Sequence, residues 1–389
     1  MNICLLAPRF PYPQYGGDAL RINEIAHYLK SKGHILTLVS FSDEEPPATE
    51  QASRLYDHIY YVRRRPRQSY FYSVIYFLLR RPMQCGYYHS KAYRKILSKA
   101  ISEQQPDLYI AHLVRLTPYL ERLGLQKQSI VEMTDALSRT YALSMNAEKG
   151  GLLKYVYYME QRLIEKYEQH VIRTFPKIVL VSQADEDFLR AKSGGPAQSL
   201  CTLPNGVHCA PHISDRYDAN RITFLGNMRT LQNQDAALYF ANRIFPRVKE
   251  VFPSARFHIV GSLPPPKIQA LASEDIVVSG FVDDLEAEIQ QSALVVAPVR
   301  VAAGIQNKVL QAMACGVPVV LSELIAPAIP QLRDGENCII AHDDDQFTAA
   351  CLRLLQESTF RNTMAEQGYQ MVRQHYDWSR KLEGYEELN

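Results

Sequence analysis

Long hydrophobic runs are missing from this sequence. No segment of the 389 residues reaches 18 consecutive apolar residues, which excludes an ordinary membrane-spanning helix. The first residues, MNICLLAP, lack a basic stretch, a long apolar region and a small-residue cleavage site, and so do not resemble a secretory signal. We therefore expect a cytoplasmic protein.

Paired cysteines and metal-binding histidine motifs are also missing. The seven cysteines are scattered and form no C-x-x-C pair, which argues against a disulfide framework or a zinc site and favours buried free thiols. The eleven histidines form no H-E-x-x-H motif. The sequence therefore predicts no metal site and no resident cofactor.

Acidic residues are absent from one long window. Between His58 and Ser102 there are ten Lys or Arg, ten Tyr or Phe and no Asp or Glu, which leaves 33 basic and 41 acidic residues elsewhere. Basic and aromatic side chains together favour an anionic membrane surface as the partner of residues 58–102. The alternative is a pair of helices with their apolar side in the core. No nucleic-acid-binding module is recognisable, so no nucleic acid partner is expected.

Strands alternate with helical patterns in both halves of the chain. NICLLAP is a continuous apolar run typical of a buried parallel strand, and residues 107–112 and 129–135 read as further strands. Turn residues between 200 and 212 indicate a linker. The sequence predicts an α/β protein with two Rossmann-like, doubly wound domains that face each other across a cleft. It also predicts single long helices over 149–173 and 231–253.

A glycine turn precedes the helical pattern of the segment GIQNKVLQAMACGVPVV, which begins at Gly304. The first backbone N–H groups of such a helix have no partner within it, and with the positive end of the helix dipole they attract phosphate. Lys308, one turn in, adds a positive charge. The alternative is a plain strand–helix turn without a ligand.

Polar residues also follow the expected strand ends of the first half. Gly16, Gly17 and Asp18 lie between the first strand and the first helix, where ligands bind in open α/β sheets, although Asp18 can equally cap the helix. Arg21, on the first turn, is expected to point to the cleft or to solvent. The G-G-D spacing does not fit a dinucleotide-binding loop.

Two further strand ends carry candidate residues. Asp135 follows one strand and is either a ligand-side residue or a helix N-cap. His112 and Arg115 follow another, and a lone His is more often a structural donor than a catalyst. We regard His112 and Arg115 as acceptor-side candidates.

Several motifs together resemble the bacterial retaining glycosyltransferases of family 4, which have the GT-B fold. They cover nearly the whole chain and are PYPQYGGDALR, PNGVH, RITFLGNM, VVSGFVDDLEAEIQQSALVVAPV, GIQNKVLQAMACGVPVV and HYDWSRKLEGYEEL. The resemblance implies an N-terminal acceptor domain over 1–203, a C-terminal nucleotide-sugar domain over 204–376, and a closing helix over 377–389 that packs back on the first domain.

The resemblance also implies roles for individual residues. The family's E-x7-E signature holds the donor sugar and the ribose, but Ala303 and Gln311 stand at those two positions. An amide oxygen at 311 still accepts a hydrogen bond from a ribose hydroxyl, whereas Ala303 offers none. Asn227 and Gln232 stand where many members have phosphate-binding Arg and Lys. The implied donor-site residues are Gly16, Arg229, Val282, Gly304, Ile305, Gln306, Lys308 and Gln311; the implied catalytic residues are Gly17, Asp18, Asp135 and Lys308.

The function implied is that of a metal-independent, retaining glycosyltransferase. It would move a sugar from a nucleotide diphosphate to a lipid-linked or glycan acceptor, in surface polysaccharide or glycolipid assembly at the inner face of the cytoplasmic membrane. The alternative is a GT-B scaffold that binds a glycan or a partner enzyme and has lost its chemistry.

Overall fold

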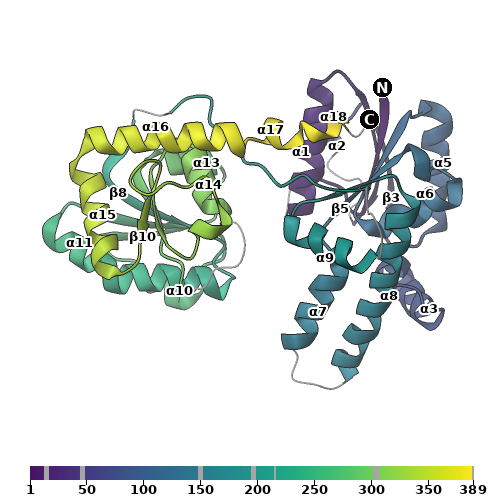
Figure 1. The fold of residues 1–389 in the computed structure, drawn as a ribbon, viewed down its shortest axis with the longest axis horizontal. Helices are drawn as coiled ribbons and strands as arrows, with labels where there is room; N and C mark the ends of the chain where they lie inside the picture. The colour runs from purple at the N-terminus through teal and green to yellow at the C-terminus, as the bar shows by residue number, and fades with distance from the viewer. Residues whose placement is uncertain are drawn as a thin grey trace. The chain divides into compact units, whose positions relative to one another are not determined.

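The chain forms two compact α/β units, each built on one parallel sheet (Figure 1). The computed structural model describes residues 1–12, 17–43, 49–147, 152–193, 199–213, 216–300 and 306–387. The N-terminal unit comprises Met1–Asn205 and Lys381–Asn389, and the C-terminal unit comprises Gly206–Arg380. The boundaries between the units therefore follow residues 205 and 380, whereas the family resemblance implies boundaries after residues 203 and 376.

The N-terminal sheet has seven parallel strands in the order β3-β2-β1-β4-β5-β6-β7. The strands are β1 Asn2–Ala7, β2 Ile35–Ser42, β3 His58–Arg63, β4 Leu108–His112, β5 Ser129–Thr134, β6 Lys177–Leu180 and β7 Leu200–Thr202. The inner strands are buried over nearly their whole length, as continuous apolar runs predict for a sheet covered on both faces.

Helices pack against this sheet, and some of them extend beyond it (Figure 1). They are α1 Gly17–Ser31, α2 Thr49–Ala52, α3 Pro66–Leu78, α4 Met83–Tyr87, α5 Lys91–Gln104, α6 Thr117–Leu123, α7 Leu137–Ala147, α8 Leu152–Thr174, α9 Gln183–Ser193 and α18 Gly384–Glu387, with short 3-10 turns at Val114–Leu116 and Gln126–Gln128. In the described part of the chain no helix combines the length and apolar character needed to cross a membrane.

One strand lies where the sequence predicts a linker. Leu200–Thr202 forms β7, which pairs in parallel with β6 at the sheet edge. Leu200 is buried in the hydrophobic core of the N-terminal unit, and this burial favours a strand although turn residues follow it. The predicted linker therefore begins only after this strand, close to Pro204.

The C-terminal sheet has six parallel strands in the order β10-β9-β8-β11-β12-β13. The strands are β8 Asp218–Leu225, β9 Arg256–Val260, β10 Ile276–Gly280, β11 Ser292–Ala297, β12 Val319–Ser322 and β13 Ile339–Ala341. In both sheets the chain runs from a central strand to one edge and then returns to build the other side. The strand order therefore reverses between β1 and β4, and between β8 and β11, where open α/β sheets bind ligands.

The helices of the C-terminal unit include one irregular segment. They are α10 Leu231–Tyr239, α11 Phe245–Val251, α12 Pro266–Gln269, α13 Leu285–Gln290, α14 Asn307–Ala314, α15 Asp344–Gln356 and α16 Ser358–His375, with a 3-10 turn at Ala326–Ala328; α17 Trp378–Leu382 spans the unit boundary. The single helix predicted over 231–253 is divided by a π turn at Phe240–Ile244. Pro246 lacks an N–H, and the Phe245 N–H instead reaches the Phe240 carbonyl.

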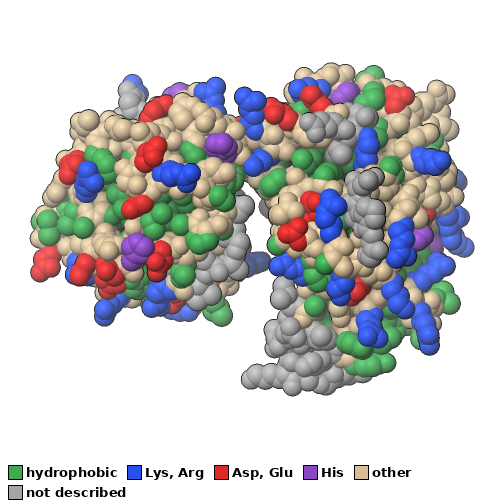
Figure 2. Space-filling model, in the orientation of Figure 1, with side chains coloured by type: hydrophobic (Ala, Val, Ile, Leu, Met, Phe, Trp, Pro, Cys, Tyr) green, Lys and Arg blue, Asp and Glu red, His purple; other side chains and the backbone are tan. Residues whose placement is uncertain are grey.

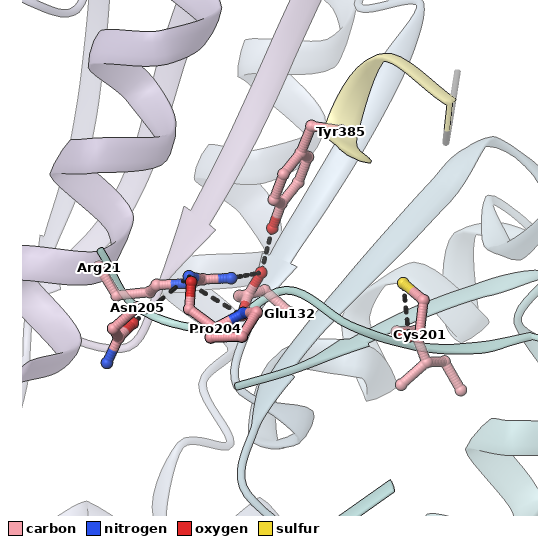
Figure 3. A network of polar contacts seen from close by, with 7 residues as sticks. Arg21, Glu132, Cys201, Pro204, Asn205 and Tyr385 are labelled. Atoms are coloured by element: carbon pink, nitrogen blue, oxygen red, sulfur yellow. Dashed lines mark hydrogen bonds and ion pairs between the residues drawn. The ribbon is translucent and has the colours of Figure 1, made fainter. Parts of the chain in front are cut away.

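A buried polar network ties the end of the chain to the N-terminal sheet (Figure 3). Arg21 Nε donates to Glu132 Oε1 at 3.3 Å, and the Tyr385 hydroxyl of α18 donates to the same carboxylate. Arg21 Nη1 also donates to the Pro204 carbonyl at 3.1 Å and to Asn205 Oδ1 at 3.3 Å. The prediction that Arg21 points to the cleft or to solvent is therefore wrong, because its ion pair with Glu132 is fully buried.

Candidate functional site

A cavity of about 420 Å³ opens in the C-terminal unit beside the start of α14, at the carboxyl ends of β8, β9 and β10. We call it the α14 cavity. Its volume lies within the roughly 300–1,000 Å³ of small-molecule sites. It is lined by Leu225, Gly226, Asn227, Thr230, Gln232, Asn233, Val260, Gly261, Ser262, Phe281, Val282, Leu285, Gln306, Asn307, Lys308 and Gln311.

The α14 cavity gathers predicted donor-site residues from separate parts of the sequence, namely Val282, Gln306, Lys308 and Gln311. Arg229 is exposed and does not line the cavity. Gly304 and Ile305, together with Ala303, lie outside the described residues.

Lys308 is the only charged side chain among the described residues that line this cavity. It is 8% exposed, its ammonium donates to Asn233 Oδ1, and it lies 4.6 Å from the centre of the Phe224 ring. Burial disfavours the charged form and lowers the pKa of Lys308 to about 8. An anion bound beside it would restore the favourable environment that this ammonium lacks.

The start of α14 adds a second source of positive potential. Its N-cap residue, Gln306, makes no capping hydrogen bond with its side chain. The first N–H groups of the helix are therefore left without the usual side-chain acceptor, and they carry the positive end of the helix dipole. A phosphate at this place would satisfy both the N–H groups and Lys308.

Backbone forms part of the floor of the α14 cavity. A Cβ built on Gly261 would lie 1.7 Å from the Gly226 carbonyl oxygen, and a Cβ on Gly226 would lie 2.7 Å from the Asn233 side chain. Only glycine fits at position 261, whereas a Cβ at position 226 would require the Asn233 side chain to shift. A ligand can therefore approach these strand ends closely.

A second cavity, of about 230 Å³, opens in the N-terminal unit where β1, β2 and β4 end. We call it the α1 cavity. It is lined by Ala7, Pro8, Arg9, Phe10, Tyr12, Asp18, Ala19, Ile22, Phe41, Ser42, Asp43, Arg64 and His112. The predicted candidates Asp18 and His112 thus share one cavity. Gly17 is described as the first residue of α1, with open space around a Cβ built there, whereas Gly16 lies outside the described residues.

His112 is buried as a neutral imidazole. It is 1% exposed, and neither ring nitrogen has a hydrogen-bond partner of acceptable geometry in the described part of the chain. Burial lowers the pKa of His112 to about 4, while the negative charge of Asp18 opposes this shift. The ring can therefore offer one donor and one acceptor to a ligand at neutral pH.

Two family models match the chain over most of its length. One, described as Glycosyltransferase Family 4, matches residues 15–210, and the other, described as Glycosyl transferases group 1, matches residues 219–357. The chain belongs to this glycosyltransferase family. The family resemblance predicted from the motifs is confirmed.

Solved structures of glycosyltransferases share the fold of this one. HepE from Anabaena, in complex with UDP, is 14% identical, with a TM-score of 0.62 over 100% of this chain and 99% of that one. A variant of S. aureus TarM, in complex with Fondaparinux, alpha-GlcNAc-glycerol and UDP, is 11% identical, with a TM-score of 0.64 over 100% and 99%. WaaG, a glycosyltransferase involved in lipopolysaccharide biosynthesis, is 12% identical, with a TM-score of 0.57 over 98% and 99%. The predicted GT-B class of two Rossmann-like domains is confirmed.

One relative is similar in sequence over nearly the full length of this glycosyltransferase. It is described as an uncharacterized 44.6 kDa protein in the cps region of Klebsiella pneumoniae. The two chains are 22% identical over 392 residues, which cover 97% of this chain and 96% of the relative.

Arg115 and Asp135, the two remaining predicted site residues, do not line the α1 cavity. Arg115 lines a different cavity of about 290 Å³ and stacks on the Tyr88 ring, 5.9 Å from its centre. Burial raises the pKa of Asp135, and the positive charge of Arg115 opposes the rise. Arg115 therefore acts electrostatically on Asp135, but neither residue lines the cavity of Asp18 and His112.

The structure adds residues that the sequence does not single out as ligands. In the α14 cavity, Gln232 Nε2 is buried without a partner in the described part of the chain, and the Phe281 ring is 72% exposed. In the α1 cavity, Arg64 forms an ion pair with Asp43 at 2.6 Å, and a hydrogen bond to Tyr88 raises the pKa of Arg9. Arg9 follows β1 by two residues, so its position after a strand end could have identified it as a candidate ligand-binding residue.

Proposed function

We propose that this glycosyltransferase moves a sugar from a nucleotide-diphosphate donor to a lipid-linked or glycan acceptor, with retention of configuration and without a metal ion. The observation that carries the proposal is the α14 cavity, where an uncapped helix start and a buried lysine meet at the carboxyl edge of the sheet. Structures with the same fold that hold UDP support it.

The α14 cavity supports specific roles in donor binding. Lys308 and the N–H groups at the start of α14 neutralise the diphosphate, and Gln311 accepts a hydrogen bond from the ribose. The exposed ring of Phe281 and the backbone at Val282 bind the base, since a flat apolar ring stacks on any nucleobase. Contacts elsewhere in the protein select the sugar, because an alanine occupies position 303.

The transfer step needs little covalent participation by the protein. An acceptor hydroxyl oxygen forms the new bond to the anomeric carbon, the bond from that carbon to the diphosphate oxygen breaks, and the hydroxyl proton passes to the departing diphosphate on the same face. Positioning and charge neutralisation are then the main contributions. Lys308 supplies charge, and Asp18 with neutral His112 orients the acceptor.

We also propose a cellular setting. The basic window 58–102 holds the enzyme as a peripheral protein at the cytoplasmic face of an anionic membrane. The likeness to a lipopolysaccharide enzyme, WaaG, supports a role in surface polysaccharide or glycolipid assembly.

Nucleotide-dependent thermal stability tests the proposal. A ligand that binds only the folded protein raises its melting temperature, so UDP, GDP or ADP is expected to shift melting by several degrees. A sugar-nucleotide panel then identifies the donor by hydrolysis or transfer. The absence of any shift and of any turnover would favour the alternative, a GT-B scaffold that binds a glycan or a partner enzyme without catalysis.

The variant Lys308→Ala tests the site itself. We expect transfer to fall by more than tenfold, because the buried charge acts directly on the diphosphate. Lys267→Ala is the matched control, since Lys267 is an exposed lysine of the same unit outside the α14 cavity. Equal turnover in the two variants would refute the role of Lys308.

A further inference from the structure

Helix α3 presents its large apolar side chains outward. The buried residues of this helix are two serines, Ser69 and Ser73. Large apolar residues, namely Tyr70, Phe71, Val74 and Leu78, followed by Leu79, are between 54% and 74% exposed, while Tyr72, Ile75, Tyr76 and Phe77 are half-buried. A helix that only covered a protein core would show the opposite arrangement, with its apolar stripe buried.

Close packing against α4 explains why the buried face of α3 is small and polar. A Cβ built on Gly86 of α4 would lie 2.6 Å from the Tyr72 carbonyl oxygen and 2.8 Å from the Tyr76 Cβ, so the two helices approach each other closely there. The Ser73 hydroxyl donates to the carbonyls of Ser69, at 3.0 Å, and Met83, at 3.3 Å. The space between α3 and α4 is therefore filled, and the outer apolar face is left for something outside this unit.

Basic side chains border this apolar face. Figure 2 shows Lys and Arg side chains next to hydrophobic ones at the end of the unit where Figure 1 draws α3. A cavity of about 290 Å³, which we call the α5 cavity, adjoins the end of α3 and the start of α5. Its basic lining consists of Arg81, Lys91, Arg94, Arg115 and Arg122.

The α5 cavity holds an excess of positive charge. Arg81, Arg94 and Arg122 form no ion pair with the described residues, and Glu121, the one carboxylate in the described lining, is bound at 3.2 Å by both Tyr167 and His170. Burial lowers the pKa of His89 in this cavity, and the nearby arginines lower it further. The start of α5, capped by Ser90, points the positive end of a helix dipole at the same place.

We propose that the α5 cavity binds the phosphate of an anionic phospholipid in a membrane leaflet, while the outer face of α3 lies in the membrane interface. The two features match the two parts of one amphiphilic surface: unpaired cations face phosphates, and aromatic and aliphatic side chains enter the apolar layer. A soluble anion would need only the cavity, and a neutral protein surface would need only the helix.

The position of the α5 cavity relates this surface to the acceptor. A broad groove shares Ser90 and Lys91 with the α5 cavity, and shares Asp43 and Arg64 with the α1 cavity. A polar chain that starts at the membrane can therefore follow basic side chains to Asp18 and His112. This step rests on the proposed function and indicates a lipid-linked acceptor rather than a free glycan.

Vesicle flotation of the full chain tests the inference. The protein is mixed with vesicles of phosphatidylcholine alone, or of equal parts phosphatidylcholine and phosphatidylglycerol, at low salt. We expect binding only to the anionic vesicles. Arg94→Gln with Arg122→Gln should weaken it about thirtyfold, since each cation near the surface contributes a factor of about five. Phe71→Ser with Leu78→Ser should also release the protein.

Two controls make the result decisive. Arg256→Gln with Lys267→Gln removes two exposed cations from the C-terminal unit and should leave flotation unchanged. If that variant and the α5-cavity variant bind vesicles equally, or if only neutral vesicles doped with a polyprenyl diphosphate are bound, the phospholipid site is refuted. The UDP-induced thermal shift, measured on the same proteins, should be the same in all of them, so failure of donor binding is recognised separately.

Discussion

At the scale of single residues, the proposed donor site depends on a lysine whose pKa is lowered by burial. Lys308 has a lowered pKa of about 8, so it loses its proton as the pH rises through that value. A bound diphosphate favours the protonated form, and we therefore expect the UDP dissociation constant to rise above pH 8. Calorimetric titration across pH 6.5–9.5 measures this. Lys308→Met should bind weakly at every pH and show no bend near 8.

The same burial predicts a cost to stability. Because the pKa of Lys308 is lowered in the folded state, the unfolded chain binds more protons between pH 8 and its ordinary pKa of 10.5, and stability rises with pH through that window. At pH 7 the folded protein holds a desolvated charge, so Lys308→Met should melt no lower than the native chain. A clearly lower melting temperature would show that Lys308 is a structural residue.

Gln311 permits a test of the altered signature. Gln311→Glu places a carboxylate at the proposed ribose position, and charge-assisted hydrogen bonds are roughly twice as strong as neutral ones. We expect UDP affinity to increase by about fivefold in Gln311→Glu and to fall in Gln311→Leu, which accepts no hydrogen bond. Equal affinities of the three proteins would exclude position 311 from ribose recognition.

At this scale the sequence predicts the residues that lie within one motif and misses those that meet through the fold. Lys308 follows from the predicted helix start, and Gln306 and Gln311 follow from the family resemblance of the same motif. The family resemblance places Gln232 at a phosphate-binding position, whereas Phe281 is not predicted as a ligand; that both line one cavity depends on the strand order β10-β9-β8-β11. The orientation of Arg21 could not be predicted from the sequence, because its carboxylate partner, Glu132, is 111 residues away along the chain.

At the scale of elements, the contact of α3 with α4 sets which face of α3 is exposed. The basic and aromatic window predicts a surface element, but its apolar residues alone do not tell which side is buried. Gly86 and the serines of α3 decide this through close approach of the two backbones. Local structure likewise explains two other differences from the prediction. β7 forms because it pairs with β6 at the sheet edge, and the π turn forms next to Pro246, which lacks an N–H.

The variant Gly86→Ala tests the packing of these helices. Its added Cβ would lie 2.6 Å from the Tyr72 carbonyl oxygen, so α3 must shift, at a cost of about 1–3 kcal/mol. The urea midpoint should fall and flotation with anionic vesicles should weaken, because the apolar face moves with α3. Ser102→Ala, at an exposed position of α5, is the control. Unchanged stability would mean that α3 is not held by this contact.

At the scale of the whole chain, three distant segments meet at one carboxylate. Glu132 of β5 binds Arg21 of α1 and Tyr385 of α18, and Arg21 holds Pro204 and Asn205, just before the chain enters the C-terminal unit (Figure 3). Val207 and Asp377, on the two crossing segments, are bridged in parallel, and a Cβ on Gly206 would lie 2.7 Å from the Trp378 Cα. The PNGVH and HYDWS motifs are therefore explained by packing.

The energetics of this carboxylate give the last prediction. Burial raises the pKa of Glu132, and Arg21 and Tyr385 oppose the rise. Arg21→Met removes the main compensation and should cost about 3–5 kcal/mol, whereas Arg21→Met with Glu132→Leu should recover much of it. In the single variant the folded pKa of Glu132 lies further above its unfolded value. The contribution of Glu132 to stability is therefore fully present only below about pH 4 and is lost as the pH rises through the folded pKa. Urea midpoints at several pH values measure this, and a pH-independent loss in the single variant would show that Glu132 is not the group left uncompensated.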